Sequence, residues 1–441
     1  MNKMKKNVIA SVAKQSFAAL SIASLVFLTA CGDDSSSGPS STDDETELSS
    51  SSNDDEGSSS SKKKDKSSSS VKESSSSSKK DKSSSSVEES SSSSVEESSS
   101  SSEISVSLTG VVFGSDYTTG ELRWIDKDGE ISKKSLSFHQ DSKVVTNGAD
   151  LYVLERKGAD NITKIDPDKL ESEGKKAVVW QVSLDDDANP TDMAFDGDQA
   201  WVALQNADSL VKISTKDGKV KKSIKTGKFA YEGEKSPYVA DIELDDGSLY
   251  VLFQRYTMDE NWVTTYPKGL LAIYDASSGD LKDTIQLKTK NPSTIAIVDG
   301  EVYVATHGEY NAASGTDADS KRGIEKVNVS KKKSELLISG EKLGGGIVSM
   351  VVDDDIVYVN IDLGMDANYA AIQELKKVNL SSKKVEDIDG FTDMSGSMAI
   401  DDGLLYVGDR GASAVVTWNG KKKNTIKQPK GALPPYNIAL F

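Results

Sequence analysis

The stretch that decides the fold is residues 240–254, ADIELDDGSLYVLFQ, and it recurs along the chain. It reads as an apolar strand, a tight Asp-Gly turn and an alternating strand that contains a Tyr-Val step. Close copies are residues 191–205 (TDMAFDGDQAWVALQ), 293–307 (STIAIVDGEVYVATH), 348–362 (VSMVVDDDIVYVNID) and 396–410 (GSMAIDDGLLYVGDR). Residues 143–156 (KVVTNGADLYVLER) form a sixth copy, and a seventh is split between the two ends of the domain. Such regular recurrence predicts a repeat architecture.

Each repeat unit holds four predicted strands. In the third unit these are residues 192–195, 199–205, 209–214 and 220–225. No amphipathic helix separates them, which argues against a parallel α/β sheet. The pattern therefore predicts an all-β fold, a seven-bladed β-propeller of four-stranded antiparallel blades. The C-terminal strand, residues 435–441, should complete the first blade beside residues 107–116, 121–126 and 132–138, so that the ring closes without a free inner edge.

Composition divides the 441 residues into three domains. Residues 1–30 join a basic head to an apolar run, which predicts a secretory signal peptide; a transmembrane anchor is the alternative, although the strictly apolar part, residues 17–30, is short for a span. Residues 31–102 are serine blocks with too few apolar side chains to fold, and they predict a disordered linker with an end-to-end distance of roughly 45–50 Å. Residues 103–441 carry nearly all the aromatic and β-branched residues and should form the propeller.

The sequence Leu28-Thr29-Ala30-Cys31 resembles the lipobox of bacterial lipoproteins. In that family the cysteine is lipidated, so the resemblance implies that Cys31 attaches the chain to a membrane. Cys31 is also the single cysteine, which excludes an internal disulfide and a CxxC redox pair. The acidic start of the linker is similar to the export signals of surface lipoproteins, which implies an outer-membrane protein exposed at the surface. A linker that crosses the periplasm, with the domain facing inward, is the alternative.

The repeats resemble the YVTN-type, YncE-like repeats of bacterial propellers over about residues 104–441. The resemblance implies the fold and no particular activity, because members of that family have diverse roles. The formal net charge of −17 argues against a nucleic-acid partner.

Loop lengths differ between the two faces of the predicted ring. Turns between the first and second strands are minimal, whereas the connections at residues 226–239, 255–269, 308–323 and 363–371 are long. In a propeller these four share one face, and insertions on one face of a repeat array indicate a binding face. Its aromatic residues, which we call the rim, are Tyr231, Tyr238, Tyr256, Trp262, Tyr266, Tyr310 and Tyr369. They stack on a sugar or anchor a protein in one interpretation and pack within their own loops in the other.

A polar residue stands near the start of each first strand. By symmetry these residues, with His307, should surround the mouth of the central channel. We call them the channel-mouth set: Asp192, Asp241, Thr294, Ser349, Ser397, Asn437 and His307. Such a ring binds a cation or a small polar ligand in one interpretation and only hydrates the channel in the other.

Motifs for catalysis are missing from the sequence. It has two histidines, His139 and His307, and no HExxH, GxSxG or P-loop pattern. We therefore expect no catalytic residue, metal ligand or cofactor, and Asp192, Asp241 and His307 are the candidates if the channel mouth does carry hydrolase or lyase chemistry. The sequence predicts a monomeric, lipid-anchored binding module of the bacterial cell envelope whose ligand is a carbohydrate or an envelope protein. An envelope assembly scaffold and a hydrolase or lyase are the alternatives.

Overall fold

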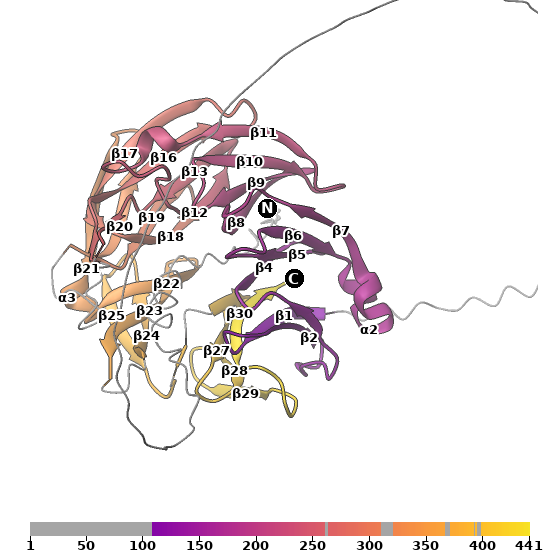
Figure 1. The fold of residues 1–441 in the computed structure, drawn as a ribbon. Helices are drawn as coiled ribbons and strands as arrows, with labels where there is room; N and C mark the ends of the chain where they lie inside the picture. The colour runs from indigo at the N-terminus through magenta and orange to yellow at the C-terminus, as the bar shows by residue number, and fades with distance from the viewer. Residues whose placement is uncertain (1–107, 261–262, 310–320, 367–370, 392, 395–397) are drawn as a thin grey trace, which may run out of the picture. The chain divides into compact units, whose positions relative to one another are not determined.

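The chain folds into seven antiparallel four-stranded sheets. They are seen in a computed structural model that describes residues 108–260, 263–309, 321–366, 371–391, 393–394 and 398–441. Figure 1 shows these sheets as blades arranged around a ring. The predicted seven-bladed propeller is thereby confirmed.

The strands of each blade follow one another from the centre outwards. They are, in blade 1, β30 (Pro435–Leu440), β1 (Leu108–Ser115), β2 (Gly120–Asp126) and β3 (Leu136–Phe138); in blade 2, β4 (Ser142–Asn147), β5 (Asp150–Glu155), β6 (Asn161–Ile165) and β7 (Val178–Ser183); in blade 3, β8 (Pro190–Asp196), β9 (Gln199–Leu204), β10 (Ser209–Ser214) and β11 (Val220–Lys225); in blade 4, β12 (Val239–Asp245), β13 (Ser248–Phe253), β16 (Lys268–Asp275) and β17 (Leu281–Lys290); in blade 5, β18 (Pro292–Val298), β19 (Glu301–Thr306), β20 (Gly323–Asn328) and β21 (Lys333–Ser339); in blade 6, β22 (Gly346–Asp353), β23 (Ile356–Met365), β24 (Ala371–Asn379) and β25 (Lys384–Ile388); and in blade 7, β26 (Met398–Asp401), β27 (Leu404–Asp409), β28 (Ala414–Trp418) and β29 (Lys423–Lys427). In the third unit the predicted bounds of the last two strands coincide with β10 and β11.

The C-terminal strand closes the ring. β30 pairs with β1 in antiparallel register, from Gly110 opposite Leu440 to Gly114 opposite Pro435, and Figure 1 shows the yellow β30 beside the indigo β1. A Cβ on Gly110 would lie 2.5 Å from the Ala439 carbonyl oxygen, so this close approach requires glycine. The inner strands then contact one another in a complete circle: β30, β4, β8, β12, β18, β22, β26 and back to β30. The predicted closure is confirmed.

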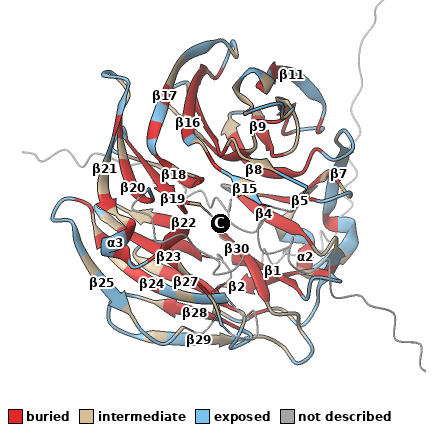
Figure 2. Ribbon diagram, turned by 60° about the vertical axis from the view of Figure 1, so that its left-hand side comes forward, coloured by how far each residue is buried: buried red, intermediate tan, exposed pale blue. Residues whose placement is uncertain are grey.

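Apolar side chains fill the space between neighbouring blades. The described residues form seven hydrophobic clusters, and each one joins residues from two consecutive blades. Between blades 3 and 4, for example, the fully buried Trp201 packs among apolar residues and its Nε1 donates to the Ala276 carbonyl at 3.0 Å. Figure 2 shows burial concentrated on the inner strands, while the outer strands β11, β25 and β29 are largely exposed. Both faces of an inner strand therefore need a neighbouring blade.

Several short elements were not predicted from the sequence. They are the hairpin β14 (Thr257–Met258) and β15 (Thr264–Thr265), the helical turns η2 (Pro167–Lys169), α2 (Leu170–Glu173) and η3 (Gly174–Ala177), and η4 (Gly227–Phe229) and α3 (Gly340–Leu343). The connection expected at residues 363–371 is partly strand, because β23 and β24 continue to a pair between Met365 and Ala371. Among the described residues, no helix has the length and apolar character that crossing a membrane requires.

Candidate functional site

Five members of the channel-mouth set occupy one equivalent position on the inner strands of their blades. They lie opposite equivalent residues of the second strands: Asn437 opposite Phe113, Asp192 opposite Ala203, Asp241 opposite Leu252, Thr294 opposite Ala305, and Ser349 opposite Asn360. All five are almost completely buried. Ser397 lies outside the described residues. The structure thus brings the predicted residues to one level of the ring but removes them from solvent.

Two of the inner-strand members accept a hydrogen bond from the backbone of the next blade. Oδ1 of Asn437 accepts a hydrogen bond from the Val144 backbone N–H of blade 2 at 2.5 Å. Oδ2 of Asp241 accepts one from the Ile295 backbone N–H of blade 5 at 2.8 Å. These oxygens satisfy buried backbone donors, so the side chains have a structural role at the blade interfaces.

Lys143 occupies the equivalent position of blade 2, opposite Leu154, and sequence analysis missed it. The alignment of the repeat contained the signal, since the sixth copy begins with this lysine. Its side chain is 4% exposed. Burial, together with the positive charge of Arg156, lowers the pKa of Lys143 to about 7, although the carboxylates of Asp192, Asp241 and Asp141 oppose the shift. The channel mouth therefore contains a buried cluster of opposite charges on blades 2 to 4.

A second group of polar side chains lies where the second strands end. Nε of Arg156 donates to Oδ1 of Asn189 at 3.0 Å, and Nδ2 of Asn189 donates to Oε1 of Gln205 at 2.7 Å. Nε2 of Gln254 donates to Oδ1 of Asn291 at 2.8 Å. We call these residues the lateral belt, because Arg156 and Gln254 each bond to the residue that leads into the next blade. Sequence analysis did not single out this belt.

His307 extends the same arrangement to blade 6. Its Nε2 lies 2.9 Å from Oδ2 of Asp362, which is the equivalent residue of β23, and both side chains are largely buried. Oδ1 of Asp362 accepts from the Gly364 backbone N–H at 2.8 Å. The pair thus joins blades 5 and 6. No group of three or more His, Cys, Asp or Glu side chains suited to a metal ion is present within the described residues.

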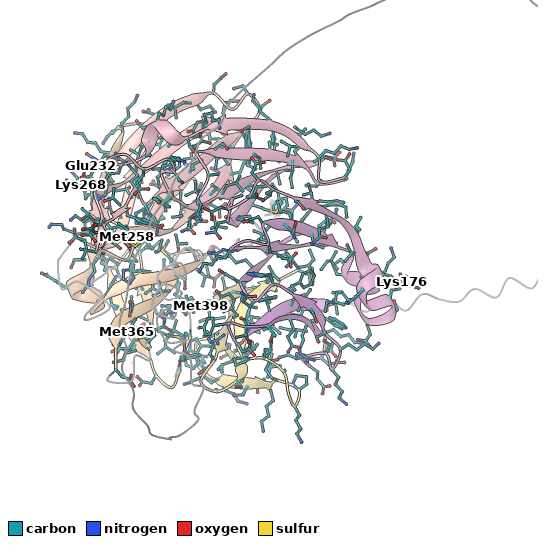
Figure 3. The ribbon with its side chains drawn as sticks, in the orientation of Figure 1. Lys176, Glu232, Met258, Lys268, Met365 and Met398 are labelled. Atoms are coloured by element: carbon teal, nitrogen blue, oxygen red, sulfur yellow. The ribbon has the colours of Figure 1, made fainter. Side chains whose placement is uncertain are left out.

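The described rim residues lie on the two connections of blade 4, at the same end of this blade as Asp241, because the insertion follows Gln254 at the end of β13. Tyr238 and Tyr256 stack with ring centroids 3.9 Å apart and planes inclined by 14°. Tyr266 packs against Tyr256 at 5.5 Å, and the Tyr238 hydroxyl donates to Oε2 of Glu234 at 2.9 Å. Figure 3 labels Glu232, Met258 and Lys268, which belong to these two connections and lie on one side of the ring.

The members of the rim differ in exposure. Tyr266 is 3% exposed and packs within its own insertion, whereas Tyr231, Tyr238 and Tyr256 are half-buried. Burial raises the pKa of both Tyr238 and Tyr256, so these hydroxyls remain protonated. Trp262, Tyr310 and Tyr369 lie outside the described residues. Tyr266 therefore packs within its own loop, whereas Tyr231, Tyr238 and Tyr256 remain partly exposed to solvent.

The backbone is strained where the two connections of blade 4 meet. Tyr238 has φ 55° and Arg255 has φ 59°, both in the left-handed region. The positions equivalent to Tyr238 in blades 3 and 5 are Asn189 and Asn291, which tolerate this region better than tyrosine does. Hydrogen bonds hold the strained pair in place: the Gln254 N–H donates to the Tyr238 carbonyl at 2.9 Å, and Nε of Arg255 donates to the Phe229 carbonyl at 2.8 Å.

Known proteins resemble this chain in fold, but they do not indicate its function. No protein-family model matches the chain, and no curated protein does so either. Among solved structures, it is similar to a functionally unknown protein from Desulfotomaculum acetoxidans, at 14% identity and a TM-score of 0.47, covering 76% of this chain and 99% of that one. It is also similar to AztD from Citrobacter koseri, at 13% identity and a TM-score of 0.45, covering 76% of this chain and 98% of that one. We draw nothing about activity or ligand from likenesses at this level.

Lys143 should make stability depend on pH. Because its pKa is 10.5 in the unfolded chain and about 7 when folded, the unfolded chain binds the extra proton between these values, and stability should rise with pH in this window. We expect Lys143→Met to flatten this rise, as measured by urea unfolding at several values between about pH 7.5 and 9.5. Equal pH slopes in the two proteins would contradict the assignment.

Proposed function

We propose that this chain is a lipid-anchored binding module of the bacterial cell envelope, which presents the rim of blade 4 to a carbohydrate. An envelope protein is the second candidate ligand. The observation that carries the proposal is the half-buried tyrosine stack built on two residues with left-handed backbone, Tyr238 and Arg255. The described members of the channel-mouth set are buried, so we do not propose them as ligand contacts.

The chemistry around the stack suits a sugar. Tyr256 covers one side of the Tyr238 ring, and the C–H groups of a sugar favour stacking on an aromatic face. The Glu234 carboxylate and the Arg255 guanidinium lie within the same two connections and supply hydrogen-bonding groups for hydroxyls. A ligand that continues the tyrosine stack would thus meet both an apolar face and charged polar groups.

The strained backbone of Tyr238 also supports a binding site at the tyrosine stack. A left-handed conformation costs about 1–2 kcal/mol for a residue such as tyrosine, and asparagine adopts it more readily. Strained conformations tend to persist at ligand sites, where the orientation of a side chain matters more than local stability. The use of Tyr238 at a position where blades 3 and 5 carry asparagine therefore supports a binding role for its ring.

We propose Cys31 as the lipid attachment point and the serine-rich segment as the tether to the outer membrane, with the propeller displayed at the cell surface. The support is the lipobox-like sequence and the composition of residues 31–102. A tether on the order of 45 Å would let the rim sample ligands beyond the membrane surface.

Tyr238→Asn should weaken ligand binding while it leaves the stability of the fold nearly unchanged. The change removes a stacked ring, worth about 0.5–1.5 kcal/mol, and relieves about 1–2 kcal/mol of backbone strain, so we expect a stability change within about 1 kcal/mol. Binding to a glycan and polysaccharide array, probed with the full chain with and without calcium, should fall at least tenfold.

The matched control is Tyr117→Asn, since Tyr117 is exposed, also has positive φ, and belongs to blade 1. This variant should bind like the unchanged protein. Undiminished binding by Tyr238→Asn would rule out the stack as the ligand site. A blank array for the folded protein would exclude the carbohydrate, and cross-linking in intact cells would then test the protein ligand.

Cys31→Ala should release the chain from the membrane. Without the thiol there is no atom to carry the proposed lipid, so the variant should move from the membrane fraction to the soluble fraction after cell lysis. Added protease should cleave the serine-rich segment of the unchanged protein in intact cells if the domain faces outward. Retention of Cys31→Ala in the membrane fraction would exclude lipidation as the anchor.

A further inference from the structure

The outer strands of the blades differ in how they are protected against pairing with another chain. An outer strand exposes one row of backbone donors and acceptors, and charged side chains, particularly lysine, normally discourage edge-to-edge association. β11, β17, β21, β25 and β29 each contain at least one lysine, and β3 is only three residues long. Among the outer strands that the structure describes, β7 combines a length of six residues, VVWQVS, with no charged residue.

β7 also differs from β11 and β17 at one equivalent position, the extra residue of a bulge. β7, β11 and β17 each contain a bulge at the same place, where one extra residue interrupts the pairing with the third strand of the blade. The extra residue is Lys221 in β11 and Lys282 in β17, but Val179 in β7. Val179 is 53% exposed. Blade 2 therefore presents an exposed apolar residue where two sister blades present a lysine.

The residues that flank β7 carry opposite charges at its two ends. Lys175 and Lys176 precede the strand, Asp185 and Asp186 follow it, and all four are exposed. None of the four forms an ion pair within the part of the chain that the structure describes. If β7 pairs antiparallel with a second β7, the end that follows Lys175 and Lys176 of one strand lies beside the end that precedes Asp185 and Asp186 of the other. The strand is thus complementary in charge to itself.

We propose that the outer edge of β7 pairs antiparallel with β7 of a second copy of this chain, which forms a dimer with two-fold symmetry. Such an isologous contact uses the same surface on both subunits and closes on itself. It joins the two blades into one eight-stranded sheet, with the exposed Val179 of each copy on the shared edge. The dimer differs from the monomer that the sequence alone led us to expect, and it does not depend on the ligand proposed for the rim.

The neighbourhood of β7 leaves this edge accessible. The helical turns before it lean towards blade 1, since Nε1 of Trp124 donates to Oε2 of Glu171 at 3.1 Å and Nζ of Lys134 lies 2.6 Å from Oε1 of the same residue. In Figures 1 and 2, β7 lies at the periphery of the ring, and Figure 3 shows Lys176 on the helical segment beside it. Blades 4 to 6 are not adjacent to blade 2, so the dimer leaves both rims free.

The first experiment measures the mass of the full chain in detergent by sedimentation equilibrium. We expect a dimer for the unchanged protein and, for Val179→Lys, a dissociation constant at least tenfold higher. The lysine should not disturb the blade, because β11 and β17 carry it at the same position, and circular dichroism checks the fold. The matched control is Val220→Lys on the neighbouring β11, where the valine is 54% exposed; this variant should dimerise normally. A monomeric unchanged protein, or a Val179→Lys variant that dimerises as well as the control, would overturn the proposal.

The second experiment tests the antiparallel orientation of the two strands with charge reversals that lie outside the strand. One double variant carries Lys175→Glu and Lys176→Glu, and the other carries Asp185→Lys and Asp186→Lys. Each should be monomeric alone, because like charges would face each other, and an equimolar mixture should form a heterodimer. Dimerisation of either variant alone, or a mixture that stays monomeric, would contradict the antiparallel pairing.

Discussion

The structure depends on one constraint: each blade is apolar on both faces, so every blade needs a neighbour on each side. An open row of seven sheets would leave two apolar faces in water. The pairing of β30 with β1 removes this problem by completing blade 1 and bringing it against blade 7, where Ile438 and Leu440 pack with residues such as Tyr406. The hydrogen bonds that Asn437 and Asp241 accept from the next blade then satisfy backbone N–H groups along the same interfaces.

The sequence predicted the fold well because the fold is local and repeated. Alternating apolar residues and Asp-Gly turns specify hairpins one after another, and errors in one unit are corrected by comparison with the others. The helical turns before β7 lacked such support, because their place depends on contacts between Glu171 and residues of blade 1. The β14–β15 hairpin was missed for a related reason: its strands are two residues long and carry no periodic signal.

The candidate site was harder to predict, because the repeat symmetry gives the position of a residue on its strand but not the atoms that its side chain contacts. The alignment of the repeats gives Asp241 and Asn437 equivalent positions, but their hydrogen bonds across the blade interface depend on side-chain length and on the neighbouring backbone. Lys143 was overlooked although it occupies the same position. Tyr266 looked equivalent to Tyr238 by composition, yet only the folded insertion shows that it lies beneath Tyr256.

The closure of the ring by residues 435–440 also sets an order of events during folding. β1 can pair with β2 at once, but its inner partner β30 is synthesised more than 300 residues later, since the two paired segments lie near residues 110 and 440. Until then, blades 2 to 7 can form from contacts within and between neighbouring hairpins, but the apolar faces at both ends of the row stay open. Contacts of such long sequence separation form slowly because a large loop must close first. The late closure therefore defines an interval in which the nascent chain needs protection from aggregation.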